Sequence, residues 1–280
     1  MTVWSKNPGK RAAERLYLAY TPVWGAVCGV VMLGGLAERW GDGPLLALGF
    51  GLWIVLLAAG FALRAPEDRG RPFYRLYHFK LAVFMALFSF FGNYFGTRYF
   101  YEVLDMHYGF RATWNLNDVP VFLYPLTAVY FTTYSVLLGV GLRAAASFSG
   151  GSRAARAGAL VAASLMLAGM ETALNANPAM KSTFCYGNMS FALWFGTLMY
   201  GSHFVIAGPA WHRIDEAKGA CTPLREVVGS VLAAFMLVIC VDEVAAKVAA
   251  PRFTTVVPGR VGIPGKQGPS CLAPPKPPSP

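Results

Sequence analysis

The chain alternates long apolar segments with short polar ones. Seven segments of about 20 residues hold few charged side chains, and they cover residues 16–36, 44–63, 79–100, 119–142, 155–175, 188–209 and 224–249. A helix of about 20 apolar residues is long enough to cross about 30 Å of hydrocarbon. The pattern therefore predicts an all-α fold, a polytopic membrane bundle of about seven transmembrane helices.

The polar segments at the two ends of the chain divide it into three parts. Residues 1–15 form a basic N-terminal tail, residues 16–250 the transmembrane helical domain, and residues 251–280 a C-terminal tail rich in Pro and Gly. Such a tail has too few apolar residues to form a core, so we expect it to be disordered.

Composition agrees with a lipid environment. Of the 280 residues, 55% are hydrophobic and 14% are charged, whereas soluble domains carry about 25% charged residues. The net charge is +10, but the basic residues lie between the apolar segments. This distribution is typical of signals that orient a membrane protein and not of a nucleic-acid-binding surface. The lipid bilayer is therefore the expected partner.

Charge distribution and cysteine spacing give two further expectations. Lys and Arg gather in the N-terminal tail and in the second, fourth and sixth loops, which predicts a cytoplasmic N-terminus by the positive-inside rule. The five cysteines form no CxxC pair and the four histidines are scattered. We therefore expect no metal site. No feature predicts a protein partner.

Residues 90–134 carry polar and aromatic side chains where a membrane segment ends and the next begins. Because polar groups are expensive in hydrocarbon, they suggest a site, and we expect this stretch to form one wall of a lipid-facing pocket. Its candidates are Asn93, Tyr94, Thr97, Tyr99, Trp114 and Asn117. Asp118 follows them and is expected to cap the fourth helix.

Successive membrane segments run in opposite directions, which predicts that acidic residues from separate helices meet at one depth in the membrane. The C-terminal ends of the third, fifth and seventh segments share a membrane side, which places Glu171, Asn175 and Asp242 together. Glu171 lies about four residues, or about 6 Å, inside its segment. A carboxyl group held away from water is suited to proton donation. Alternatively, Glu171 forms a structural ion pair with Arg98.

Short motifs in a fixed order resemble cycloeucalenol cycloisomerase, the cyclopropyl sterol isomerase family of plants and algae. They are Lys10-Arg11, the run at 20–24, Gly92-Asn93-Tyr94-Phe95, Trp114, Asn117, Val119-Pro120, Glu171-Thr172 and Asp242. The resemblance implies a sterol-biosynthesis isomerase of the endoplasmic reticulum membrane. It would open the 9,19-cyclopropane ring of a cyclopropyl sterol, converting cycloeucalenol to obtusifoliol, without a cofactor.

The resemblance also suggests roles. Ring opening protonates carbon, passes through a cation and loses a second proton. We expect Glu171 to donate, Asp242 or Tyr94 to accept, and Asn93 and Asn117 to orient them or the sterol hydroxyl, with aromatic faces stabilising the cation. Plant members carry histidine where this chain has Arg98, Val121, Ala128 and Ser135, so no histidine mechanism transfers. The alternative is a non-catalytic sterol-binding or sensing membrane protein.

Overall fold

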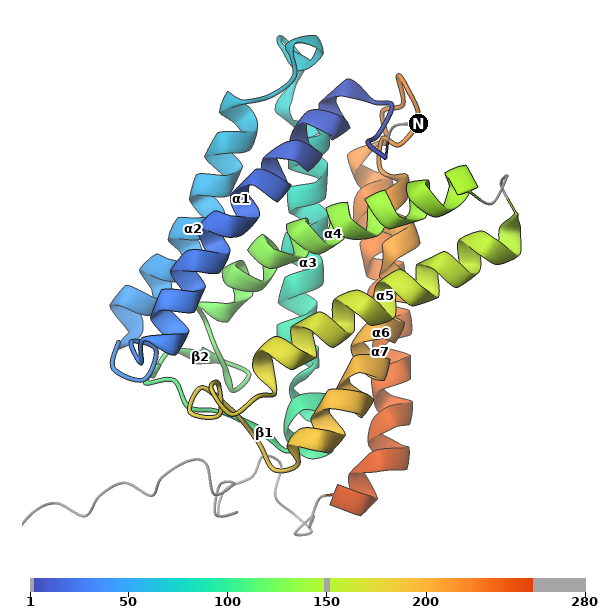
Figure 1. Cartoon of the computed structure of the whole chain (residues 1–280). Helices are drawn as coiled ribbons and strands as arrows, with labels where there is room; N and C mark the ends of the chain where they lie inside the picture. The colour runs from blue at the N-terminus through green and yellow to red at the C-terminus, as the bar shows by residue number, and fades with distance from the viewer. Residues whose placement is uncertain (1–2, 149–151, 254–280) are drawn as a thin grey trace, which may run out of the picture.

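The computed structural model describes residues 3–148 and 152–253. It confirms the all-α bundle (Figure 1). Its long helices are α1 (Pro8–Leu33), α2 (Asp42–Ala62), α3 (Tyr77–Phe95), α4 (Leu123–Phe148), α5 (Arg153–Asn175), α6 (Met189–Arg213) and α7 (Leu224–Phe253). In the described part of the chain, six of them are long and apolar enough to cross a membrane. The exception is α3, which carries the buried residues His78 and Lys80.

The connections between the helices hold short elements. Two turns of 3-10 helix, η1 (Pro66–Asp68) and η2 (Phe73–Arg75), lie between α2 and α3, and a turn of π-helix, η3 (Tyr99–Val103), follows α3. Strand β1 (Met106–Tyr108) pairs antiparallel with β4 (Phe184–Tyr186), and β2 (Asn115–Leu116) pairs antiparallel with β3 (Val119–Pro120). Figure 1 shows both strand pairs at the end of the bundle opposite the start of α1.

Two helix starts differ from the sequence-based boundaries. Helix α1 begins at Pro8, because the Asn7 side chain caps it by accepting from the backbone N–H groups of Gly9 and Lys10. The expected tail boundary at residue 15 thus falls inside α1. Helix α4 begins at Leu123, because Asn117 and Asp118 (φ 50° and 62°) form the two-residue turn of the β2–β3 hairpin. Asp118 does not cap α4.

At the other end of the chain, α7 continues to Phe253. The first three residues of the predicted C-terminal tail, 251–253, are therefore helical, and the rest of that tail, 254–280, lies outside the described residues.

Helix α3 lies at the centre of the bundle, and its aromatic side chains hold three other helices. The ring of Phe88 packs against Phe131 of α4, Trp211 of α6 and Phe235 of α7, with centroid distances of 5.5, 6.0 and 5.9 Å. Aromatic pairs at such distances add to the energy of burial. In the described residues, α3 is therefore the element against which the other helices are positioned.

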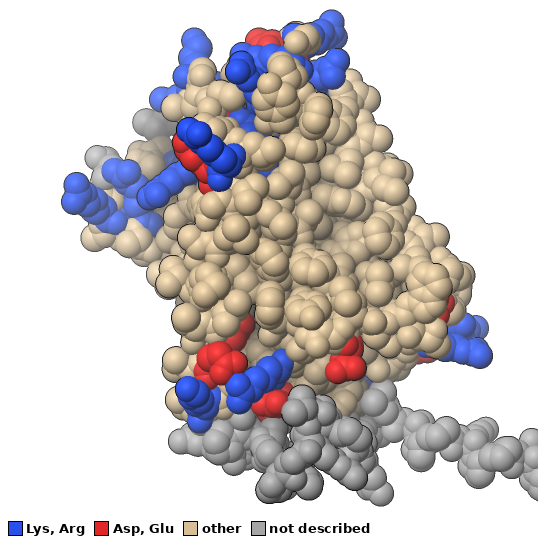
Figure 2. Space-filling model, turned by 180° about the vertical axis from the view of Figure 1, so that it is seen from behind, with Lys and Arg blue, Asp and Glu red and all other residues tan. Residues whose placement is uncertain are grey.

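The outer surface of the bundle is apolar between two charged ends. Figure 2 shows Lys and Arg gathered at one end, a smaller set of acidic and basic residues at the other, and an uncharged band between them. Large apolar side chains such as Ile54, Met166 and Met236 are more than half exposed on the helices. This surface suits contact with lipid tails, and the chain is a multi-pass membrane protein.

A charged cluster closes the end of the bundle where α1 starts. Lys10 is fully buried and donates to Glu216 (2.8 Å) and to the carbonyl oxygens of His212 (2.6 Å) and Ile214 (2.9 Å). Arg143 joins Glu14 (2.5 Å) to Glu216 (2.6 Å). Because the cluster links α1 and α4 to the connection between α6 and α7, it fixes these elements relative to one another.

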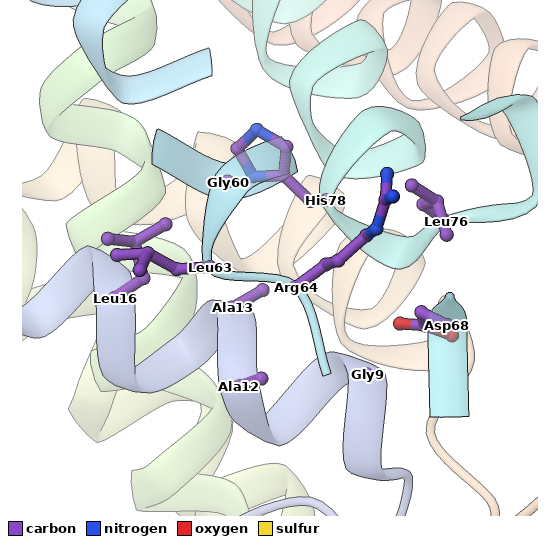
Figure 3. A pocket seen from close by; sticks show the side chains of 10 residues that line it. All are labelled: Gly9, Ala12, Ala13, Leu16, Gly60, Leu63, Arg64, Asp68, Leu76 and His78. Atoms are coloured by element: carbon purple, nitrogen blue, oxygen red, sulfur yellow. The ribbon is translucent and has the colours of Figure 1, made fainter. Parts of the chain in front are cut away.

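The contact between α2 and α3 near this end depends on a glycine. His78 of α3 lies over Gly60 of α2 (Figure 3), where a Cβ would approach the imidazole ring to 2.0 Å. The ring accepts from the Tyr17 hydroxyl (2.7 Å) and donates to the Leu57 carbonyl (3.1 Å), so His78 is structural. The gap beside it has a volume of about 10 Å³, enough for about one water molecule and too small for an organic ligand.

Acid should destabilise the charged cluster. Burial by itself raises the pKa of the Glu216 carboxyl, but the hydrogen bonds from Arg143 and the charge of Lys10 outweigh it and lower the pKa from 4.5 to about 2. A lowered pKa contributes stability that is present above pH 4.5 and is lost as the pH falls toward 2. We expect the melting temperature of the protein in detergent to fall over this window.

The matched variants are Glu216→Gln and Glu67→Gln, since Glu67 is exposed and lies outside the cluster. Glu216→Gln should lower the melting temperature at neutral pH and flatten its acid dependence, and Glu67→Gln should leave both unchanged. An acid dependence identical in the wild type and Glu216→Gln would contradict the assignment.

Candidate active site

A large cavity lies in the half of the bundle away from the charged cluster. Its volume is about 520 Å³, and it is bounded by α1, α4, α5 and α6 and by the connections that follow α3 and α5. Small-molecule pockets typically occupy about 300–1,000 Å³. Figure 1 shows α4 between α1 and α5, and all three helices contribute lining residues to the cavity.

The paired strands β1 and β4 close one end of this cavity. Met106 and Tyr108 of β1 and Phe184 and Tyr186 of β4 line it, and the residues between them do not. This alternation follows from the two-residue period of a strand. Burial raises the pKa of the Tyr108 and Tyr186 phenols above the ordinary value, so both stay neutral.

Glu171 of α5 lies on the cavity wall. It is 5% exposed, and its Oε2 atom has no hydrogen-bond partner in the described residues. Its polar neighbour is the Tyr130 side chain of α4, which also contacts the Thr127 hydroxyl (3.3 Å). An acidic group that is buried and only partly satisfied is unusual, which makes Glu171 a candidate functional residue.

A second, smaller cavity of about 60 Å³ adjoins the first. Six residues line both, namely Asn93, Phe100, Thr127, Tyr130, Glu171 and Tyr200. On its far side, His203 of α6 donates to Asp242 of α7 with an Nε2–Oδ1 distance of 2.8 Å. Glu171 thus stands at the boundary between a ligand-sized cavity and a smaller chamber that reaches Asp242.

Several residues predicted from the sequence reach these cavities. Asn93 is buried, donates to the Ser89 carbonyl (2.9 Å) and to the Thr127 hydroxyl (3.1 Å), and lines both cavities. Tyr99 and Asp242 line the small cavity, and Asn175 lines the large one. The structure therefore brings Glu171, Asp242, Asn93, Tyr99 and Asn175 to one place.

Four other predicted residues lie elsewhere. Tyr94, Thr97, Trp114 and Asn117 line neither cavity. Asn117 lies in the hairpin turn and donates to the Tyr94 carbonyl and to the Thr97 hydroxyl (3.1 Å). Trp114 is 62% exposed. Asn117, Tyr94 and Thr97 thus attach the β2–β3 hairpin to the end of α3, whereas the backbone N–H of Trp114 donates to Asp42 of α2 (2.9 Å). The roles of all four residues in catalysis or binding stay predictions.

The alternative ion pair between Glu171 and Arg98 is not formed. Arg98 pairs with Glu102 (2.8 Å) and Glu243 (2.7 Å), and all three side chains are exposed. No charged group neutralises Glu171 among its described contacts. A structural ion pair therefore does not account for its burial.

Comparison with known proteins supplies the family. Cycloeucalenol cycloisomerase of Arabidopsis thaliana is 30% identical over 244 residues, which cover 85% of this chain and 86% of that protein. No family model and no solved structure matches the chain. The chain belongs to the cycloeucalenol cycloisomerase family. It is therefore an isomerase of the cyclopropyl sterol class at the family level.

Sequence reasoning missed several side chains that line the cavities. Tyr130, Tyr134 and Tyr200 line the large cavity, and His203 pairs with Asp242. The position of His203 within a membrane segment was a usable signal, because ionisable residues in such segments usually mark functional sites. The tyrosines gave no signal, since aromatic residues are common throughout the segments.

The site of this family member offers acid–base chemistry in an aromatic surrounding. It combines a sheltered carboxyl group, a His–Asp pair and several tyrosine rings, and the described residues contain no cluster able to hold a metal ion. Carboxyl groups transfer protons, and aromatic faces stabilise cations.

The position of Asn117 predicts an effect on stability. Its φ of 50° is a left-handed conformation, which costs about 1–2 kcal/mol for most residues and little for Asn or Gly. Asn117→Ala should therefore lower the melting temperature of the purified protein more than Asn117→Gly, since both lose the side-chain bonds and only Ala adds strain. Equal melting temperatures for the two variants would contradict this role.

Proposed function

We propose that this protein opens the 9,19-cyclopropane ring of a cyclopropyl sterol, converting cycloeucalenol to obtusifoliol, with Glu171 as the proton donor. The observation that carries the proposal is the Glu171 carboxyl group, buried with an unpartnered oxygen on the wall of a cavity of about 520 Å³. A cavity of this size, mostly apolar with a few polar groups, suits a small lipid.

The reaction requires a proton to be added and another to be removed. Transfer of the Glu171 proton to C19 breaks the C9–C19 bond and leaves positive charge at C9. Loss of the proton at C8 then forms the C8–C9 double bond, and Asp242, through the small cavity, is the proposed acceptor. One proton enters and one leaves, so the product is an isomer of the substrate.

The aromatic lining supports the cationic step. Tyr130, Tyr134 and Tyr200 come from two helices and surround the space beside Glu171. A cation near such ring faces is stabilised by about 0.5–2 kcal/mol per ring, more where water is excluded. The same rings shelter the carbon centre from water, which would otherwise compete for the charge.

The rim of the cavity supports entry from the lipid phase. Leu33 of α1 and Leu174 of α5 line the cavity and are 67% and 58% exposed on the surface of the bundle. A sterol dissolved in the membrane would therefore enter between α1 and α5, with its hydroxyl toward the polar end at Asn175 and Asn177.

The proposed location is the endoplasmic reticulum membrane with a cytoplasmic N-terminus. Support comes from the basic residues near α1 and on the loop between α2 and α3, which lie at the same end of the bundle (Figure 1). The cavity end would then face the lumen.

Replacing Glu171 tests the donor. Glu171→Gln keeps the size and polarity of the side chain but removes the transferable proton, so we expect turnover of cycloeucalenol in membranes to fall by about 100-fold or more. Product and substrate have the same mass, so chromatographic retention or NMR must distinguish them. Wild-type turnover by this variant would remove Glu171 from the role.

Two controls complete the test. Glu102→Gln changes an exposed carboxyl group that pairs with Arg98 outside the cavities, and it should turn over normally. If the wild type binds cycloeucalenol but returns it unchanged, the protein is a sterol-binding protein and the proposed reaction is wrong.

Filling the cavity tests where the substrate lies. Gly29 of α1 lines the cavity, and a Cβ built on it would meet nothing within 4 Å. Gly29→Trp should therefore fold normally but occupy substrate space, and we expect kcat/KM for cycloeucalenol to fall by about tenfold or more.

The matched control is Gly51→Trp, because Gly51 of α2 also has open space and lines neither cavity. It should keep wild-type kcat/KM. Equal activity of the two variants would place the substrate outside this cavity.

A further inference from the structure

We propose that His203 is a proton-relay residue that, together with Asp242, carries protons between Glu171 and the membrane surface through the small cavity. The proposal rests on the proposed function, because it assigns the step that restores the donor after each turnover. It adds a residue and a route to the ring-opening chemistry.

The small cavity connects the relevant groups. Glu171 stands on one side of it, and the His203–Asp242 pair stands on the other, while the six shared lining residues separate it from the large cavity. Its volume of about 60 Å³ exceeds the 10–15 Å³ that one water molecule needs. A short chain of water molecules can therefore link Glu171 to His203.

Two buried polar atoms point to an occupant in this space. The Oε2 atom of Glu171 and the hydroxyl of Tyr99 have no hydrogen-bond partner in the described residues, and the two side chains are 5% and 2% exposed. Both residues line the small cavity. Buried polar groups are normally satisfied, so ordered water is the occupant that their chemistry calls for.

The far end of the route lies near the surface of the bundle. The side chains of His203 and Asp242 are 12% and 15% exposed, and the neighbouring Glu243 forms an exposed pair with Arg98. Exposure thus rises from Glu171 through His203 and Asp242 to the bundle surface. An imidazole is suited to the middle position, because one nitrogen can take up a proton while the other releases one.

The proton balance closes without another reactant. Glu171 gives its proton to C19 and becomes a carboxylate, and the proton lost from C8 passes to Asp242. Asp242 then releases this proton to water at the membrane surface, and the relay returns one through His203 and the water of the small cavity to Glu171, which restores the acid. No oxidant or reductant takes part.

His203→Gln tests the relay. Glutamine can still donate a hydrogen bond to Asp242 but cannot carry a proton, so a purely structural role would tolerate it. With purified protein in lipid nanodiscs, we expect kcat for cycloeucalenol to fall by about tenfold or more with KM unchanged. The matched control is His107→Gln, since His107 forms a comparable pair with Asp105 (3.2 Å) outside both cavities. It should keep wild-type kcat.

A spectroscopic measurement separates the relay from the proposed reaction. The carbonyl stretch of the protonated Glu171 side chain, assigned by its absence in Glu171→Gln, shifts when its proton exchanges with D₂O. We expect exchange to be at least about tenfold slower in His203→Gln and in Asp242→Asn than in the wild type and in His107→Gln.

Wild-type exchange in His203→Gln would overturn the relay, whatever the activity. Because this measurement needs no turnover, it decides the relay even if the wild type does not open the cyclopropane ring. Absence of ring-opened product from the wild type would overturn the proposed function alone.

Discussion

The candidate site depends on the burial of one acidic group. Glu171 lies inside an apolar bundle with one carboxyl oxygen unpartnered. A charge in such a place is expensive, and a neutral carboxyl group is less so, which favours the form that can donate a proton. Tyr130 is the polar neighbour of this carboxyl group among the described residues, and the group lines both cavities.

The two ends of the bundle differ in structure. At the end where α1 starts, Lys10, Glu14, Arg143 and Glu216 neutralise one another and hold three segments together, namely α1, α4 and the connection between α6 and α7. Breaking such a partly buried cluster leaves uncompensated charge, which is strongly destabilising. The opposite end has the cavities, an unneutralised acid and short strands in place of long helices. Rigidity at one end thus supports an open site at the other.

Helix geometry decided which polar residues of the central stretch reach the site. Asn93, Gly96 and Phe100 line the small cavity at spacings of three and four residues, as one helical face requires. Tyr94 is adjacent to Asn93 in sequence but is turned by about 100° around the axis, so it points away. Sequence proximity had grouped the two residues because no pattern in that apolar, aromatic segment distinguished its faces.

The sequence by itself determined the class of fold and the approximate limits of the helices, because hydrophobic length is a property of the chain order, and its motifs indicated the family. Only the tertiary structure decided that Asn117 belongs to a hairpin turn, that His203 pairs with Asp242, and that the tyrosines of α4 and α6 enclose Glu171. Those outcomes depend on the rotation of each helix about its axis and on strand pairing across distant connections. Both are set by packing between segments that are distant in the sequence, so a local sequence pattern does not predict them.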